Sequence, residues 1–296
     1  MTQDAEQKKR SNLPALLAAI YLPVTGGFDF VFIEYISDYI DSVNLVFIRV
    51  AVIAILFYAL HRIRFGKLNI ARGDLLRFFL AGGIGIGTYY IIEAIGIAWT
   101  SASLSSIILA TVPLFSLFGD RLIFGTRITP MKLAGVVASI AGVALIIFAG
   151  GGALSGGLAG IGLLFLASAE WAAYIIIAKP LHERYPTFTV TTGLFVSALF
   201  VTLPIFLLYK PENVLHFSPG NWALTVFFAV VCIAIAQLLY MVGVKNLPVT
   251  TTAIVMNLLP LVAVITSWIV FHEMLTPLQL LGGAIILAAI TVVARE

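Results

Sequence analysis

This 296-residue sequence contains little cysteine and little charge. Its single cysteine, Cys232, lies in the middle of an apolar segment, which excludes disulfides and cysteine-based metal sites. Charged residues form only 10% of the chain, whereas about a quarter of the residues of a soluble domain are charged. No N-x-[ST] glycosylation acceptor occurs. The chain therefore resembles neither a disulfide-rich domain nor an ordinary soluble one.

Signatures of catalysis and of nucleotide binding are also missing. The sequence holds no H-E-x-x-H, G-x-S-x-G or G-x-G-D pattern, and its 4 histidines are scattered. His272 and Glu273 are adjacent, but no second histidine follows at helical spacing. No P-loop is present, which disfavours an ATP-driven pump. We therefore expect neither an enzyme nor a bound cofactor or metal.

Hydrophobic residues dominate what is there. They form 61% of the chain, and the mean hydropathy is +1.08. A hydrocarbon core about 30 Å thick needs roughly 20 apolar residues per helix, so the chain suffices for about ten spans and no soluble domain. The apolar segments are long and do not alternate, which favours helices over a β-barrel. We expect an all-α membrane protein that is embedded in the lipid bilayer.

Short polar breaks, glycines and prolines divide the apolar sequence into ten predicted transmembrane helices. Their ranges are 12–37, 43–64, 73–98, 102–124, 130–149, 157–181, 187–210, 219–245, 250–271 and 277–294. The third of these contains a cluster of glycines, at positions 82, 83, 85 and 87. No strand precedes the cluster, so it predicts close helix packing and not a dinucleotide site.

Basic residues predict the orientation. The net charge of +3 suggests nucleic acid at first, but the bases lie in short loops between helices, and we reject that partner. With a cytoplasmic N-terminus, fifteen of the 17 Lys and Arg residues fall on the cytoplasmic side. Only Lys210 lies opposite, and Arg49 lies inside the second helix. The positive-inside rule therefore places both termini in the cytoplasm. We expect a multi-pass protein of the cell membrane, in bacteria the inner membrane.

An internal repeat appears when the sequence is shifted by 147 residues. The stretch "TVPLFSLFGDRLIFGTRITPMKLAG" (111–135) then overlays "LLPLVAVITSWIVFHEMLTPLQLLG" (258–282), with two prolines, a Thr-Pro pair and a glycine in register. Each half holds five helices, an odd number, so the second half enters the membrane from the opposite side. We predict two inverted five-helix repeats, 12–149 and 157–294, around a central cavity. A cytoplasmic tail (1–11) and a connecting loop (150–156) complete the chain.

With these two segments, the sequence resembles the drug/metabolite transporter superfamily, in its ten-helix EamA-type branch. The stretch "EWAAYIIIAK" (170–179) is similar to the start of the family's second half, and Arg49 stands where the family often has an arginine. The resemblance covers nearly the whole chain. It implies secondary transport of small metabolites, commonly amino acids and often outward, through a cavity opened alternately to each side.

The chain departs from the family pattern by added acids. Family first helices commonly read W-G-S-N-F-V-x-x-K, whereas this chain has Asp29 for the Asn and Glu34 for the Lys. The second half keeps Trp171 and Lys179, and we assign Lys179 a structural or gating role. Just before Trp171, where the family usually has a small or apolar residue, stands Glu170.

Three ionisable residues are predicted to share one layer inside the membrane. At 1.5 Å per residue, Asp29 lies roughly 13 Å deep, and Arg49 and Glu93 lie about 10 Å from the outer surface. An ion pair between Arg49 and either acid is as good an interpretation as a substrate site, because buried charges are normally paired. By contrast, Glu34, Asp38 and Asp41 lie near the outer helix end and are expected to reach headgroups and water.

Glu170 is predicted to lie too deep in the membrane for its carboxylate to reach headgroups or water. It lies roughly 18 Å deep, near the midplane, and Tyr174 shares its helix face with Trp171 alongside. The cluster offers a carboxylate and aromatic faces to an ammonium, or an exchangeable proton. The alternative is a protonated Glu170 that bonds between helices. In the third helix, Tyr89 and Tyr90 precede Glu93 by four and three residues and form a second polar-aromatic face.

Other polar residues and prolines complete the candidates. Gln237, Tyr240 and Asn257 lie at mid-membrane depth, where a bond between helices is the commoner role, although Tyr240 also enters our candidate site. Pro113 and Pro260 are predicted to kink equivalent helices, which suits gating as well as packing. The predicted substrate site thus comprises Glu170, Trp171, Tyr174, Tyr89, Tyr90, Glu93, Asp29 and Tyr240.

The expected function is secondary transport by alternating access. The expected substrate is a small polar metabolite, most simply an amino acid or related zwitterion moved outward, for which Arg49 and an acid supply opposite partners. The alternative is an amine or other cationic metabolite, with protons as coupling ion through Glu170. The sequence leaves substrate identity, direction and oligomeric state open.

Overall fold

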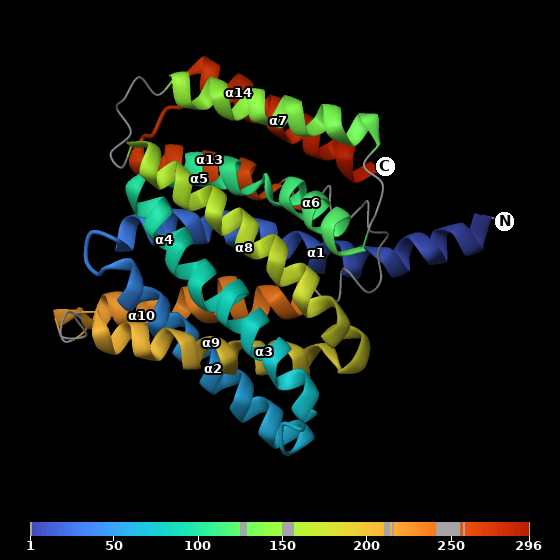
Figure 1. Ribbon diagram of the computed structural model, residues 1–296, viewed down its shortest axis with the longest axis vertical. Coiled ribbons are helices and arrows are strands. Elements are labelled where there is room, and N and C mark those ends of the chain that lie inside the picture. Colours follow the sequence, from blue (N-terminus) through green and yellow to red (C-terminus); the bar gives the residue numbers. More distant parts are fainter. Residues whose placement is uncertain are drawn as a thin grey trace.

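The computed structural model describes residues 2–124, 129–149, 157–209, 214, 216–240, 255–256 and 258–295. Across these ranges the chain is almost entirely helical, with no strand. The helices form one bundle from which the start of α1 projects (Figure 1). The predicted all-helical fold class is therefore confirmed.

The helices follow one another with short connections. Their bounds are α1 Thr2–Ile36, α2 Ser42–Phe65, η1 Arg72–Asp74, α3 Leu75–Gly82, η2 Gly83–Thr88, α4 Tyr89–Trp99, α5 Ala102–Leu109, α6 Val112–Phe124, α7 Pro130–Ala149, α8 Gly157–Arg184, α9 Thr187–Leu208, α10 Pro219–Phe228, η4 Ala229–Ile235, α13 Leu258–Phe271 and α14 Pro277–Arg295. Of these, η1 is a 3₁₀ turn, and η2 and η4 are π-helical.

These elements combine into the ten predicted spans. The third span is α3, η2 and α4 in succession, the fourth is α5 followed by α6, and the eighth begins with α10 and η4. Seven stretches of the described chain are long and apolar enough to cross a membrane, and three shorter apolar helices accompany them. The shorter ones lie in α7, α13 and α14.

Local capping fixes several helix ends. Asp41 Oδ1 accepts a hydrogen bond of 3.0 Å from the Asn44 backbone N–H and caps α2, which ends at Gly66 with a positive φ of 79°. Ser101 and Ser218 cap α5 and α10 in the same way. Such side chains satisfy backbone N–H groups that have no partner within the helix.

One predicted helix boundary was wrong. The first helix begins at Thr2 and not at residue 12, because residues 4–10 are mostly good helix formers that continue the helix beyond its apolar part. Its membrane-length apolar stretch still begins at Leu13. The helix predicted over 102–124 breaks at Ala110 and Thr111, just before Pro113, whose ring cannot continue an α-helix without loss of a hydrogen bond.

The two halves of the bundle repeat one another in packing and in backbone geometry. Helix α7 packs along α14, and α2 along α9, at opposite edges of the bundle (Figure 1). A shift of 147 residues carries the π-helical segment Gly83–Thr88 onto 230–235, inside the second π-helical segment Ala229–Ile235. A rare backbone form at equivalent positions supports the inverted repeat more strongly than shared apolar residues do.

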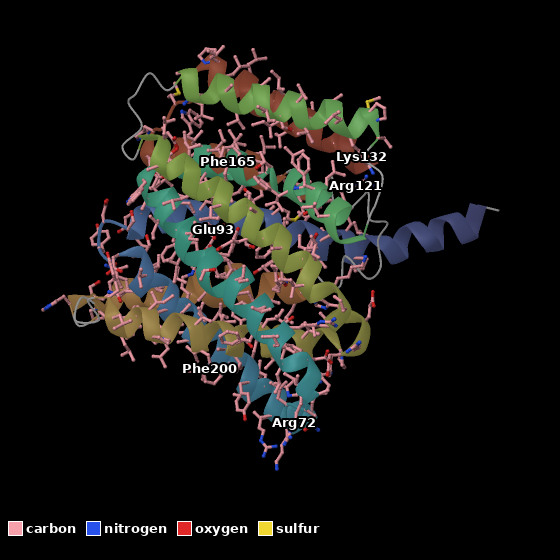
Figure 2. The ribbon with its side chains drawn as sticks, viewed as in Figure 1. Arg72, Glu93, Arg121, Lys132, Phe165 and Phe200 are labelled. Atoms are coloured by element: carbon pink, nitrogen blue, oxygen red, sulfur yellow. The ribbon has the colours of Figure 1, made fainter. Side chains whose placement is uncertain are left out.

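The charges separate the two ends of the bundle. The end formed by residues 37–41, 100–101 and 272–276 carries Asp38, Asp41 and Glu273, and we call it the acidic end. The end formed by residues 66–71 and 185–186 is flanked by bases, and we call it the basic end. Arg72, Arg121 and Lys132 lie at the margins of the bundle, whereas Glu93 lies among the helices (Figure 2).

Glycine permits the closest helix contacts. A Cβ built on Gly85 would lie 2.2 Å from the Tyr174 Cβ, so α8 touches the backbone of η2 at this position. Gly82 approaches α9 in the same way, with 2.3 Å to the Leu194 carbonyl oxygen. The predicted role of these glycines in helix packing is confirmed, and Gly85 places Tyr174 beside the third span.

We expect Gly85→Ala to destabilise the protein by about 1–3 kcal/mol or more, because the new methyl group forces α8 away from η2. The matched control is Gly162→Ala on α8, where an added Cβ meets nothing within 4 Å. That change should be neutral or stabilise by about 1 kcal/mol through helix propensity. Thermal unfolding of both variants in detergent tests this pair, and equal melting temperatures would contradict the predicted contact.

Candidate functional site

A buried ion pair lies between the first two helices. Arg49 Nη2 donates to both carboxylate oxygens of Asp29, at 2.6 and 2.5 Å. Only 4% of Arg49 and 9% of Asp29 are exposed. The sequence left an ion pair with Asp29 or Glu93 open, and the structure selects Asp29. Because a charge is costly in hydrocarbon, each partner makes the other tolerable at this depth.

The Arg49 side chain keeps part of its hydrogen-bonding capacity unused. Its Nε is buried and has no hydrogen-bond partner. The same side chain lines a small cavity of about 10 Å³ with Tyr90 and Ile233, a volume that suits about one water molecule. A buried guanidinium N–H without a partner is costly, so it marks a place where a ligand or water completes the structure.

Glu93 forms the second buried polar group of this layer. Its Oε1 accepts a hydrogen bond of 2.6 Å from the Tyr89 hydroxyl, one helical turn earlier. Glu93 is 6% exposed and interacts electrostatically with both Asp29 and Arg49. The predicted common layer of Asp29, Arg49 and Glu93 is therefore present, and it carries two acids for one base.

Four aromatic rings continue from the cavity toward α8. Ring centroids are 5.2 Å apart for Tyr90 and Tyr89, 4.7 Å for Tyr89 and Trp171, and 4.9 Å for Trp171 and Tyr174. These distances are those of tilted aromatic pairs in contact. We call Tyr90, Tyr89, Trp171 and Tyr174 the aromatic row. The structure thus brings together two groups of predicted site residues, one from each half of the repeat.

Glu170 lies beside the row and not within it. Both of its carboxylate oxygens are 3.2 Å from the Thr88 hydroxyl, which also lies 3.2 Å from the Ile84 carbonyl oxygen. Thr88 is the last residue of η2, so Glu170 joins α8 to the π-helical segment. Unlike Arg49 and Glu93, Glu170 is only partly buried. This contact is a hydrogen bond between two helices, which is the alternative role that the sequence left open for Glu170.

Other predicted residues lie apart from this cluster. Tyr240 is partly buried, and no hydrogen bond or ring contact among the described residues joins it to the aromatic row. Lys179 is exposed on α8. Pro113 is the second residue of α6 and Pro260 the third of α13, as the repeat predicts. The break before Pro113 confirms one kink, while Asn257 and residues 241–254 lie outside the described part of the chain.

A network at the acidic end was not predicted. Glu273 accepts hydrogen bonds from Ser101 (2.5 Å) and Ser103 (2.7 Å), and a third from Ser267. Its carboxylate thereby joins the α13–α14 connection to the start of α5. His272 before it has a left-handed backbone, with φ of 55°, which a non-glycine residue adopts only where its surroundings hold it.

Glu34 completes this network from the first helix. Its Oε2 accepts a hydrogen bond of 2.7 Å from the Ala102 backbone N–H, at the start of α5. The expectation that Glu34 reaches headgroups and water was therefore wrong, because an unpartnered helix N-terminus attracts a carboxylate more specifically. Asp38 is exposed, as expected. We call Glu34, Glu273 and their partners on α5 and α13 the acidic-end latch.

The basic end has a smaller connection between helices. Asp74 accepts hydrogen bonds from Arg184 Nη1 at 2.8 Å and from the Tyr185 hydroxyl at 2.9 Å. Tyr185 in turn accepts one of 3.1 Å from the Ala71 backbone N–H. These contacts join the start of the third span to the end of α8. A metal-binding cluster is a separate question. Within the described ranges, no group of three His, Cys, Asp or Glu side chains that could hold a metal ion is found.

Comparison with known proteins extends over most of the chain. It is 28% identical over 228 residues to a probable terminal-alkyne amino-acid exporter of Streptantibioticus cattleyicolor, which covers 75% of this chain and 74% of the relative. It is 27% identical over 283 residues to a probable biotin transporter of Pseudomonas aeruginosa, with 92% and 95% covered. Among the solved structures that match, one protein structure has a TM-score of 0.65 at 16% identity over 96% of both chains, which supports the fold.

The family comparison matches the two halves separately. The model of the EamA-like transporter family matches residues 13–148 and again residues 158–295. These ranges agree with the repeat deduced from the 147-residue shift and with the paired π-helical segments. On this evidence the chain is a membrane transport protein that belongs to the EamA-like transporter family.

Proposed function

We propose that this transporter moves an amino acid or related zwitterion out of the cell by alternating access, with Arg49 as the carboxylate-binding residue. The observation that carries the proposal is the buried Arg49 Nε, which has no partner and belongs to a side chain that lines the central cavity. A guanidinium binds a carboxylate through two parallel N–H bonds, and a point charge cannot reproduce that geometry. The substrate carboxylate accepts the hydrogen bond from Arg49 that Asp29 does not accept.

The ammonium group of the substrate is assigned to Glu93 and the aromatic row. Tyr90 contacts the cavity together with Arg49, and Tyr89 holds Glu93 in place through its hydroxyl. Ring faces within about 6 Å of an ammonium attract it, and a nearby carboxylate adds charge. The acid and the rings therefore provide a cationic half-site beside the anionic half-site of Arg49.

The substrates named for the two relatives are consistent with one half-site for a carboxylate and another for an ammonium group. An amino acid and biotin share a carboxylate, and only the amino acid carries an ammonium group as well. A carboxylate in both named substrates is consistent with a carboxylate-binding role for Arg49. The buried acids near it, Asp29 and Glu93, favour the zwitterion over a substrate with a carboxylate alone.

The cavity is too small for an amino acid in this conformation, so substrate entry requires opening of the bundle. The acidic-end latch is the proposed outer gate. Glu34 joins α1 to α5, and Glu273 joins the α13–α14 connection to the same helix, so its release frees one end of the cavity. The positive-inside rule places this end outside the cell and both termini in the cytoplasm.

We expect Arg49→Lys to weaken amino-acid binding at least about tenfold, because the ammonium of lysine can pair with Asp29 but presents no fork to a second carboxylate. Isothermal titration of purified protein with L-amino acids, their decarboxylated amines and their deaminated acids measures the effect. The wild type should prefer the amino acids over both analogues.

A second variant separates binding from folding. Asp29→Asn with Arg49→Gln removes both charges together, which buried pairs tolerate better than loss of one partner. This double variant should retain its thermal unfolding transition and bind no amino acid. Amino-acid binding that survives in the folded double variant would refute the assignment of the carboxylate site.

A cationic substrate is the second candidate, because two buried acids, Asp29 and Glu93, accompany one guanidinium, and the partly buried Glu170 lies beside the aromatic row. In that case Glu170 is the proposed proton-coupling group. Glu170→Gln should then abolish the pH dependence of transport in proteoliposomes and leave the protein folded. The matched control is Glu183→Gln, an exposed acid on the same helix. Unchanged pH dependence in the Glu170 variant would exclude the coupling role.

The lone cysteine offers a direct test of the gate and of the orientation. Cys232 is 5% exposed, precedes the cavity-lining Ile233, and provides the only thiol of the chain. Glu273→Gln weakens three charge-assisted hydrogen bonds, each worth about 1.5–3 kcal/mol, so the outer end should open more often. A membrane-impermeant thiol reagent applied to right-side-out vesicles should then label Cys232 severalfold faster.

The control for this experiment is Asp38→Asn, which removes an exposed acid from the same end of the bundle. It should leave the labelling rate unchanged. An unchanged rate in the Glu273 variant would contradict the gate. Faster labelling that occurs only in inside-out vesicles would contradict the proposed orientation.

A further inference from the structure

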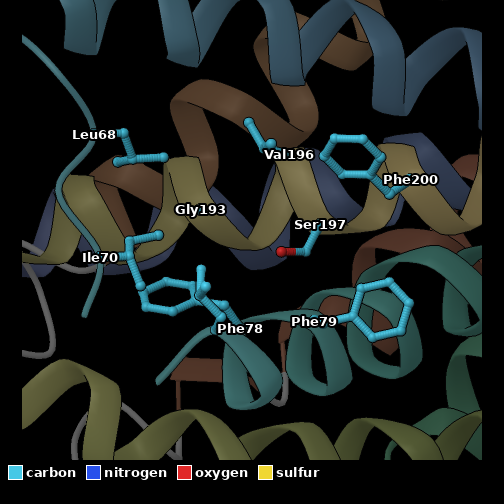
Figure 3. A pocket seen from close by; sticks show the side chains of 9 residues that line it. Leu68, Ile70, Phe78, Phe79, Gly193, Val196, Ser197 and Phe200 are labelled. Atoms are coloured by element: carbon cyan, nitrogen blue, oxygen red, sulfur yellow. The ribbon is translucent and has the colours of Figure 1, made fainter. Parts of the chain in front are cut away.

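A groove separate from the transport site lies at the basic end. It has a volume of about 380 Å³ and lies between α9, the start of α3 and the loop 66–71 (Figure 3). Leu68 and Ile70 form its loop side, Phe78 and Phe79 its α3 side, and Ser197 and Phe200 its α9 side. The volume lies in the range of ligand pockets, about 300–1,000 Å³, and nearly all the lining side chains are apolar.

The groove faces the surroundings of the bundle and not its centre. Phe200 is 67% exposed and Phe79 48% exposed, and both belong to membrane-spanning segments. Apolar side chains so exposed on these helices lie against lipid hydrocarbon. Gly193 forms part of the inner wall, where an added Cβ would lie 2.6 Å from the Phe78 ring, so the groove is closed toward the core. Its opening therefore admits an acyl chain.

Three bases lie within two residues, along the sequence, of residues that line this groove. Lys67 precedes the lining residue Leu68, Arg72 follows Ile70 by two residues, and Arg77 precedes Phe78. All three bases are exposed. The neighbouring acid Asp74 already accepts hydrogen bonds from Arg184 and Tyr185. An apolar groove next to three exposed bases matches a ligand with an apolar chain and an anionic head.

We propose that this groove binds an anionic phospholipid, with one acyl chain between α3 and α9 and the phosphate against Lys67, Arg72 and Arg77. Basic residues at a membrane surface attract anionic headgroups, and each contributes independently of the acyl contact. The bound lipid holds the loop 66–71 against the start of the third span, which leads through η2 to Tyr89 and Glu93. The site is independent of the proposed substrate.

Native mass spectrometry of the full chain, titrated with phosphatidylglycerol or with phosphatidylcholine of identical acyl chains, tests the proposal. Phosphatidylglycerol should bind at least about tenfold more tightly. The triple variant Lys67→Gln, Arg72→Gln, Arg77→Gln should lose this preference. The matched triple variant Arg121→Gln, Lys132→Gln, Lys179→Gln removes the same charge elsewhere at the basic end and should keep it.

A separate variant tests the proposed contact between the acyl chain and the groove. Val196→Trp fills the groove and should reduce retention of both lipids, whereas Leu208→Trp, at an 89% exposed position on the same helix, should not. Equal affinity for the two lipids, an unchanged preference in the first triple variant, or equally effective competition by soluble glycerol phosphate would each overturn the proposal. Lys67, Arg72 and Arg77 are exposed, so their substitution leaves the fold intact and the headgroup result does not depend on Val196→Trp.

Discussion

The structure depends on the pairing of a charge that cannot lie alone in hydrocarbon. Arg49 is buried within the second span, and a guanidinium at that depth is tolerated only beside an acid or in water. Asp29 supplies the acid and thereby fixes α1 against α2. The same pairing leaves Nε without a hydrogen-bond partner, in a side chain that lines a small cavity. A structural ion pair and a substrate site are therefore two uses of one side chain, and they do not exclude each other.

The repeat explains why the cluster lies where it does. The π-helical segments η2 and η4 occupy equivalent positions in the two halves, and each leads into the central layer. Thr88 ends the first and Tyr89 follows it, and the second carries Ile233, which lines the cavity with Arg49. A π-helical turn widens the helix and redirects the side chains after it, which is why such turns occur at functional sites. Because η2 and η4 are related by the repeat, they direct side chains of both halves toward the layer of Arg49 and Glu93.

Much of this arrangement followed from the sequence, and the rest depended on contacts between distant segments. Continuous apolar stretches predicted the spans, the paired prolines predicted the repeat, and depth along the helix placed Asp29 and Arg49 in one layer. Glycine-rich sequence did not predict a π-helical turn, because Gly83–Thr88 and Ala229–Ile235 share no pattern that could signal one. Glu273 was noticed only as part of a failed metal motif. Its partner Ser101 lies 172 residues away in sequence, and local pattern carries no such information.

The contacts at the centre and at the ends differ in how readily water can replace them, and the difference suits alternating access. Loss of one partner from a buried ion pair such as Arg49 and Asp29 costs about 3–5 kcal/mol, so the central layer remains assembled. Glu273 is held by neutral serine hydroxyls and Glu34 by one backbone N–H, and each such bond to a charged group contributes about 1.5–3 kcal/mol. Water replaces neutral donors readily once the helices separate, but it does not replace a guanidinium. In the proposed cycle the acidic-end latch therefore opens while the Arg49 layer stays intact, and the substrate carboxylate meets an arginine already held in position by Asp29.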